Sequence, residues 1–182
     1  MKRLLIAVGV LASLAFSTSF AANGGLQAFG TGMVTIGADG TSATIVNASG
    51  QYGGVYVQSK SASGLALSAL VSAPLSFVST GFETGGAPRF SIPINTSGAA
   101  GGLGSVAGYA FIDAPGCGGS PSATVTVSTA SATCGVNFQG IEYTNWSTFA
   151  ADFPSYRTAQ GHFPFIIADE AGSYAVNSIV LS

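Results

Sequence analysis

The chain has 182 residues, of which 47% are hydrophobic and only 7% are charged, and it contains 26 glycines and seven prolines. This length corresponds to a single domain. Five basic and seven acidic residues give a net charge of −2, and because neutralising phosphates requires clustered Lys and Arg side chains, nucleic acid is excluded as a partner.

Residues 1–21 are predicted to form a secretory signal peptide. Two basic residues follow the initial Met, an apolar segment spans 4–16, and small residues at Ser19 and Ala21 form a cleavage site. The apolar segment is shorter than the roughly 20 residues that cross a bilayer, which disfavours the alternative of an uncleaved anchor. We expect a secreted domain at 22–182, extracellular or periplasmic, with no membrane span after cleavage. Its three basic and seven acidic residues would give it a net charge of −4.

Short β-branched and aromatic segments, separated by Gly, Ser, Asn and Pro, predict an all-β domain built as a sandwich or a barrel of antiparallel strands. Asp39-Gly40 predicts a hairpin turn, and the composition of residues 95–105 predicts a flexible loop. The expected strands are Met33–Ile36, Ser42–Val46, Gly54–Gln58, Leu75–Ser79, Arg89–Ile94, Ser105–Asp113, Ala123–Thr129, Thr133–Phe138, Phe163–Ala168 and Tyr174–Leu181.

Two segments are candidates for short helices. Residues 63–72 fit a helical turn or a loop that crosses a sheet edge, and residues 145–159 fit a helix that Pro154 limits, because proline removes a donor and clashes inside a helix.

Residues 123–138 show a strand pattern on both sides of a turn. Thr124 and Thr126 alternate with Val125 and Val127, so one face is hydroxylated and the other is apolar. The apolar alternation resumes after the turn, and we therefore expect a hairpin here.

Cys117 and Cys134 are the two cysteines of the chain. An even pair in an exported domain predicts one disulfide, which would tie the hairpin to the glycine-rich loop before it. A metal site would need more ligands than two cysteines at this spacing, and His162 is the single histidine.

Several motifs follow one another in a suggestive order: "LSFVST", "GGAPRFSIPI", a glycine-flanked cysteine, "NWSTF" and "FIIADEAGSYAVNSIVL". This order resembles a group of exported bacterial β-sandwich domains that are similar to jelly-roll carbohydrate-binding and galactose-binding-like modules. The resemblance covers residues 52–182 in fragments. It implies a single antiparallel β-sandwich of jelly-roll type.

The resemblance also bears on calcium. The closing strand of this group often carries an acidic residue where Asn177 stands here. If that carboxylate holds a structural calcium in the group, the site is weakened in this chain. Asp169 and Asn177 remain weak candidates for a calcium shell, and no other cofactor is expected.

Arg89 stands at the start of an alternating segment. Phe90, Ile92 and Ile94 fall on one side of the expected strand, and Arg89 falls on the other, outer side. Pro93 cannot donate to a ladder, which predicts an edge position or a bulge. Arg89 either pairs with a neighbouring carboxylate, Asp169 or Glu170, or donates hydrogen bonds to a ligand.

Trp146 is the only tryptophan. Sugars commonly stack on an aromatic face while amides and carboxylates bind their hydroxyls, and Glu142, Tyr143, Asn145 and Trp146, with Arg89, are the candidate ligand-binding residues. The alternative is that Trp146 is a core or rim anchor whose indole N–H finds a carbonyl.

No sequence pattern points to catalysis. His162 follows a glycine in an expected loop, and the chain has neither a G-x-S-x-G nor an H-E-x-x-H motif. We expect a secreted, non-catalytic binding module for neutral glycans or another cell-surface component. The alternative is a structural or self-associating surface protein, which the low charge and the Ser, Thr and Gly content would also suit.

Overall fold

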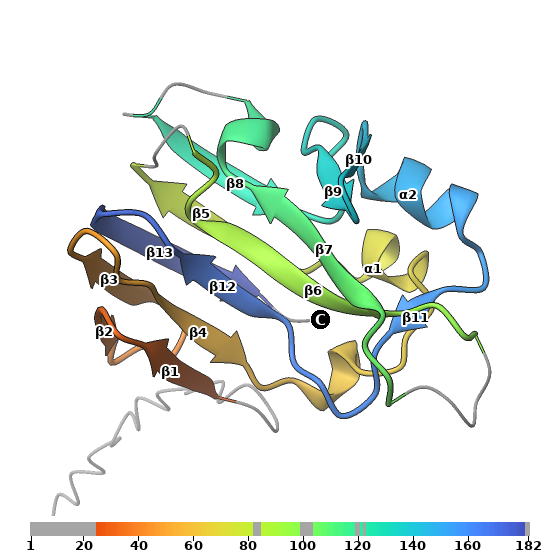
Figure 1. The fold of residues 1–182 in the computed structure, drawn as a ribbon, viewed down its shortest axis with the longest axis horizontal. Helices are drawn as coiled ribbons and strands as arrows, with labels where there is room; N and C mark the ends of the chain where they lie inside the picture. Colours follow the sequence, from red (N-terminus) through yellow and green to blue (C-terminus); the bar gives the residue numbers. More distant parts are fainter. Residues whose placement is uncertain (1–24, 82–84, 99–103, 119–120, 122, 181–182) are drawn as a thin grey trace, which may run out of the picture.

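The computed structural model describes residues 25–81, 85–98, 104–118, 121 and 123–180. They form two antiparallel β-sheets that pack face to face (Figure 1). The expected signal peptide at 1–21 lies outside the described residues. In the part of the chain that is described, no helix has the length and apolar character needed to cross a membrane.

The wider sheet, sheet A, has the order β1-β4-β12-β6-β7-β9-β10, and β11 also pairs with β6; sheet B has the order β2-β3-β13-β5-β8. Sheet A contains β1 (Leu26–Gly30), β4 (Gly53–Val57), β12 (Phe165–Ala168), β6 (Arg89–Asn95), β7 (Gly108–Asp113), β9 (Val136–Phe138), β10 (Ile141–Tyr143) and β11 (Arg157–Thr158). Sheet B contains β2 (Met33–Ile36), β3 (Ala43–Asn47), β13 (Gly172–Val180), β5 (Ser76–Thr80) and β8 (Thr124–Ser128).

The order of the strands is that of a jelly roll. Within sheet A the four strands β4-β12-β6-β7 are adjacent, and they face β3-β13-β5-β8 of sheet B. Along the chain, β3, β5, β8 and β13 belong to sheet B and alternate with strands of sheet A, so the connections form the two Greek keys of this architecture. The expected all-β sandwich of jelly-roll type is confirmed.

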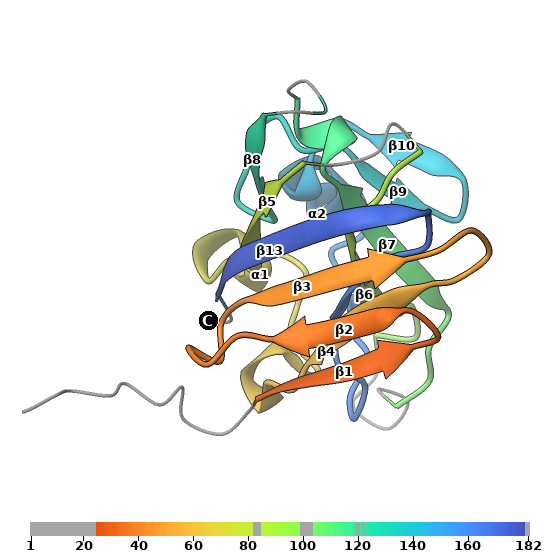
Figure 2. The same cartoon turned by 90° about the vertical axis from the view of Figure 1, so that its left-hand side faces the viewer.

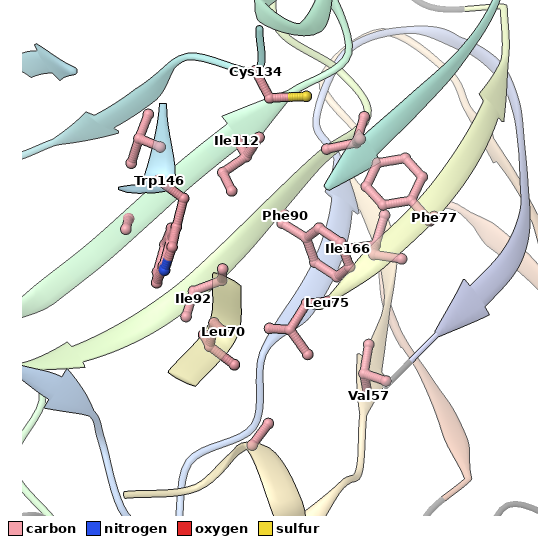
Figure 3. Packing of buried hydrophobic residues seen from close by; sticks show 14 of the residues in the cluster. Val57, Leu70, Leu75, Phe77, Phe90, Ile92, Ile112, Cys134, Trp146 and Ile166 are labelled. Atoms are coloured by element: carbon pink, nitrogen blue, oxygen red, sulfur yellow. The ribbon is translucent and has the colours of Figure 1, made fainter. Parts of the chain in front are cut away.

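The core lies between the inner faces of the two sheets. Phe77 from β5 and Phe90 from β6 meet edge to face, with ring centroids 4.9 Å apart (Figure 3). Ile92 and Ile112 from sheet A are fully buried beside them. Figure 2 shows β2, β3 and β13 of sheet B side by side. The hairpin turn between β2 and β3 is the one that the sequence predicts, with Asp39 Oδ1 accepting from the backbone N–H of Thr41 at 3.0 Å.

Two short helices lie at one end of the sandwich, where β9 and β10 extend sheet A (Figure 1). They are α1 (Ala69–Ser72) and α2 (Trp146–Asp152). The side chain of Asn145 caps α2 by accepting from the N–H of Thr148 at 2.9 Å. The helix ends before Pro154, as the sequence predicts.

The predicted disulfide between Cys117 and Cys134 is present. It joins the short 3-10 helix η2 (Pro115–Cys117) to the segment that leads into β9. The expected hairpin between residues 123 and 138, however, is wrong.

Strand β8 pairs with β5 in sheet B, whereas β9 pairs with β7 in sheet A. The intervening segment therefore passes from sheet B to sheet A. The hydroxyl of Thr129 holds this segment in place by donating to the carbonyl of Leu70 at 2.5 Å. Both strands direct apolar residues into the same core from opposite sheets, which produces the alternation expected of a hairpin.

The expected edge position of Pro93 is also wrong, because β6 lies inside sheet A between β12 and β7. Pro93 O accepts from the N–H of Ala159 at 2.8 Å. The polar edge of the Pro93 backbone thus faces the gap between β11 and β12. No described strand pairs with β6 there, so the missing N–H of Pro93 costs no hydrogen bond between strands. All ten expected strands exist within a few residues of their expected bounds, while β1, β10 and β11 were not expected. Part of the expected loop at 95–105 lies outside the described residues.

Candidate functional site

The outer face of sheet A carries aromatic side chains on neighbouring strands. Phe29 on β1 is paired with Gly54 on β4, and Tyr56 on β4 is paired with Phe165 on β12. Residues that are directly opposite in an antiparallel pair share a face. The inward neighbours of Tyr56 on its strand are buried, so these rings point away from the core.

Four rings on this face form a contiguous group, which we call the aromatic row: Phe29, Tyr56, Phe165 and Tyr109. Phe29 and Tyr56 contact each other and both contact Phe165, which in turn contacts Tyr109. The ring centroids lie 4.5 Å apart for Phe29 and Tyr56, 5.6 Å for Tyr56 and Phe165, and 5.5 Å for Phe165 and Tyr109. The exposed fraction is 37% for Tyr56 and 38% for Tyr109. Tyr56 and Tyr109 therefore keep more than a third of their surface in contact with solvent.

Gly54 makes the start of the aromatic row possible. A Cβ atom at this position would lie 2.6 Å from Cζ of Phe29 and 2.2 Å from the carbonyl oxygen of Ile166. Since such approaches are too close for a side chain, only glycine lets the Phe29 ring lie over β4 and reach Tyr56.

A groove of about 380 Å³ lies beside the aromatic row. Its lining combines aromatic rings with polar side chains: Gln27, Tyr56, Gln58, Tyr109, Gly161, His162, Phe163 and Phe165. No carboxylate, ammonium or guanidinium group occurs among these described lining residues. The groove therefore suits a neutral ligand with one apolar side and several hydroxyl or amide groups.

The polar groups of the groove are held in place by hydrogen bonds. Gln58 Nε2 donates to Gln27 Oε1. His162 Nε2 donates to the carbonyl of Gly104 at 3.0 Å, and the N–H of Gly161 donates to Ser63 Oγ at 3.0 Å. The loop before β12 is thus fixed at the rim of the groove.

Arg89 lies on the same outer face, as predicted, and it is paired. Its Nη1 and Nη2 donate to Oδ1 and Oδ2 of Asp169 at 2.8 and 2.6 Å. The guanidinium also lies 5.3 Å from the centroid of the Phe111 ring. Of the two interpretations of Arg89, the structural one is confirmed, with Asp169 as the partner.

The hydrogen bonds from Arg89 lower the pKa of Asp169 below its ordinary value of 3.8. A carboxyl whose pKa is lowered by folding stabilises the fold above its unfolded pKa, and this stabilisation is lost as the pH falls through the folded pKa. Because the Asp169 side chain is 40% exposed, solvent screening limits the effect to about 1 kcal/mol or less.

We therefore expect Asp169→Asn to weaken the fold slightly at pH 7 and to flatten the loss of stability between about pH 5 and pH 2. Urea denaturation at a series of pH values measures this difference. Asp152→Asn, at the exposed end of α2, is the control that should leave the pH profile in place. A profile of the Asp169→Asn variant identical to that of the wild type would contradict the assigned role of the ion pair.

The predicted ligand-binding set does not form one site. Trp146 lies within the packed core (Figure 3). Its exposed fraction is 0%, and its indole N–H donates to the carbonyl of Leu67 at 2.8 Å. No sugar can stack on a ring that the core covers, so its expected role in binding is wrong. The alternative of an anchor with a carbonyl partner is the one that the structure bears out.

The other members of that set also have local roles. Tyr143 packs against Phe149 at 5.1 Å, and Asn145 caps α2. Glu142 is exposed on β10, where it accepts from Asn137 Nδ2. Strands β7 and β9 separate it from β6, the strand of Arg89.

The structure does not bring the two calcium candidates together. Asp169 binds Arg89, whereas Asn177 lies in the second half of β13, opposite Val78 of sheet B. From Gly172 to Asn177 the strand extends roughly 16 Å. Among the described residues there is no group of three or more His, Cys, Asp or Glu side chains that would hold a metal.

The aromatic row was not predicted from the sequence. The alternation of Tyr56 with the buried Val55 and Val57 is a signal that Tyr56 faces outward, but it does not say which rings lie beside it. No protein-family model matches the chain, and no curated protein matches it either.

Proposed function

We propose that this chain is a non-catalytic binding module that holds a neutral glycan on the aromatic row. The observation that carries the proposal is the set of adjacent, partly exposed rings beside an uncharged groove. Exposed apolar area costs hydrophobic stabilisation, and soluble domains rarely keep a contiguous patch of it without a binding role.

The chemistry of the face supports a sugar ring as the ligand. A pyranose has an apolar side formed by C–H groups, which are attracted to the negative face of an aromatic ring. Its edge carries hydroxyls, which need partners that donate and accept hydrogen bonds. The aromatic row supplies the first kind of partner, and Gln27 and Gln58 supply the second.

The size of the groove supports a short stretch of glycan. Ligand pockets commonly enclose about 300 to 1,000 Å³, and the groove is near the lower limit at about 380 Å³. Its rings are also inclined to one another, by 67° for Tyr56 and Phe165 and by 69° for Tyr109 and Phe165. Inclined rings favour a single glycan chain bound in the groove rather than the flat surface of a crystalline polysaccharide.

The test is retention of the purified protein on a panel of insoluble neutral polysaccharides, followed by calorimetric titration with soluble fragments of any that bind. Tyr56→Ala is expected to lower the affinity at least about 30-fold, the effect of truncating a central aromatic anchor. Tyr52→Ala is the matched control, because Tyr52 is 44% exposed but does not line the groove.

Equal retention of the Tyr56→Ala variant and the wild type would overturn the proposal, as would the absence of retention on every neutral glycan. Assembly that depends on concentration, seen by light scattering and abolished by Tyr56→Ala, would instead support the alternative of self-association through the same face.

A further inference from the structure

We propose that Gln27 and Gln58 act as one recognition unit that binds a vicinal diol of the sugar ring. This inference rests on the proposed function, and it names the chemical feature that the groove selects. Gln27 stands opposite Tyr56 in the pairing of β1 with β4, and Gln58 follows β4 directly. Both side chains line the groove.

The hydrogen bond between the two amides determines what they offer to a ligand. Gln58 Nε2 donates to Gln27 Oε1, and one primary amide has two N–H donors and one oxygen acceptor. After this bond forms, Gln27 keeps both N–H groups of its Nε2, and Gln58 keeps its Oε1. One N–H of Gln58 and one lone pair of Gln27 Oε1 also remain. If both amides are turned over, the pair still presents one NH₂ group and one carbonyl oxygen. The hydrogen-bonded pair therefore keeps both a donor and an acceptor for a ligand.

Two vicinal hydroxyls of a pyranose present the complementary arrangement. One hydroxyl oxygen accepts from the amide N–H, and the neighbouring O–H donates to the amide oxygen. The amides are also immobilised in advance by their mutual bond, which lowers the entropy cost of binding. A single isolated hydroxyl would satisfy only half of this pair and would leave the other half desolvated.

The adjacent ring makes the two contacts simultaneous. Tyr56 is on the same face as Gln27, since opposite residues of an antiparallel pair share a face. A sugar ring that stacks on Tyr56 therefore has an edge directed at the amides. His162 Nε2 is already bound to the carbonyl of Gly104. The amide pair is therefore the principal hydrogen-bonding partner of the sugar hydroxyls.

This arrangement predicts which linkages are accepted. Sugars joined through positions 1 and 4 keep adjacent hydroxyls on every internal ring, whereas hexoses joined through positions 1 and 3 keep them only at the chain end. We expect retention on 1,4-linked glucans, mannans or xylans and weak retention on 1,3-linked glucans.

Periodate oxidation gives the sharper experiment, because periodate cleaves the carbon–carbon bond of a vicinal diol and leaves other hydroxyls intact. Retention of the wild-type protein is measured on a 1,4-linked polysaccharide before and after oxidation with periodate and reduction with borohydride. We expect the treatment to abolish retention. We also expect Gln58→Ala and Gln27→Ala each to lower the affinity for the untreated glycan about tenfold, the effect of losing one hydrogen bond and leaving its partner unsatisfied.

The matched control is Gln51→Ala, which removes a glutamine that binds the backbone N–H of Ala48 outside the groove. It should leave both the affinity and the sensitivity to periodate unchanged. Thermal melting of each variant confirms that the fold is intact.

Failure of this inference is distinguishable from failure of the proposed function. Retention that survives periodate, or that is equal on 1,3-linked glucan, and that still requires Tyr56 would overturn the diol assignment while supporting glycan binding. Absence of retention on every untreated glycan would overturn both.

Discussion

Replacing Trp146 with alanine is expected to lower the free energy of unfolding by about 3–5 kcal/mol, the usual effect of truncating a fully buried aromatic side chain. The ring is enclosed by the core and lies 5.4 Å from Phe149. The substitution would also leave the carbonyl of Leu67 without the indole N–H that it accepts. Loss of packing and loss of a buried hydrogen bond act in the same direction.

Denaturation in urea, followed by circular dichroism, measures this loss. Tryptophan fluorescence is unsuitable because the chain has no second tryptophan. Trp146→Phe is the informative companion: it keeps a ring against Phe149 but removes the donor to Leu67, so it should cost less than the alanine variant. A loss below about 1 kcal/mol for Trp146→Ala would show that the ring is not a core anchor.

Removing the disulfide is expected to have the second largest effect, about 3 kcal/mol. Cys117 and Cys134 are 17 residues apart, and in the chain-entropy model a crosslink over a loop of this size stabilises a protein by about that amount, because it restricts the unfolded chain. Alanine is the appropriate replacement at both positions, since serine would introduce a polar hydroxyl at the buried Cys134.

The measurement compares denaturant midpoints of the double variant and the wild type, with and without reductant. The wild type should lose stability on reduction, and the Cys117→Ala, Cys134→Ala variant should be insensitive to it. Intact mass under denaturing, non-reducing conditions provides the check on the crosslink itself. Two free thiols in the folded wild type would contradict the bond, and equal midpoints of the two proteins would contradict its contribution.

The alternation of apolar and polar residues was sufficient to predict ten of the strands but not β1, β10 and β11. The pattern of Phe90, Ile92 and Ile94 predicted the inner face of β6 correctly, because side chains alternate in any strand. Alternation does not reveal which strand lies alongside. For this reason the segments before and after Thr129 suggested one hairpin, although they belong to different sheets.

The buried position of Trp146 did have a signal in the sequence. Trp146, Phe149, Ala150 and Phe153 recur at helical spacing, and such a stripe predicts the face of a helix that packs on a core. The interpretation of Trp146 as a sugar-binding residue did not take this helical spacing into account. Arg89 was more predictable, because in a chain with so few charges a nearby carboxylate is the expected partner of an arginine.

The aromatic row, by contrast, could not be predicted from the sequence. Phe29, Tyr56, Tyr109 and Phe165 are widely separated along the chain, and they meet only because four pairings among the five strands β1, β4, β12, β6 and β7 align them. Register depends on the packing of the whole sheet and on turn geometry, neither of which a local pattern contains.

This origin has a practical consequence. No peptide cut from the chain can present the ring surface, because each strand contributes a single member and the outermost one, β1, has only β4 as a neighbour in its sheet. Separation of β1 from β4 would remove one ring from the aromatic row while the rest of the sandwich remained folded. A ligand that contacts all the rings therefore requires β1 to be paired with β4, and its binding would slow proteolysis of β1.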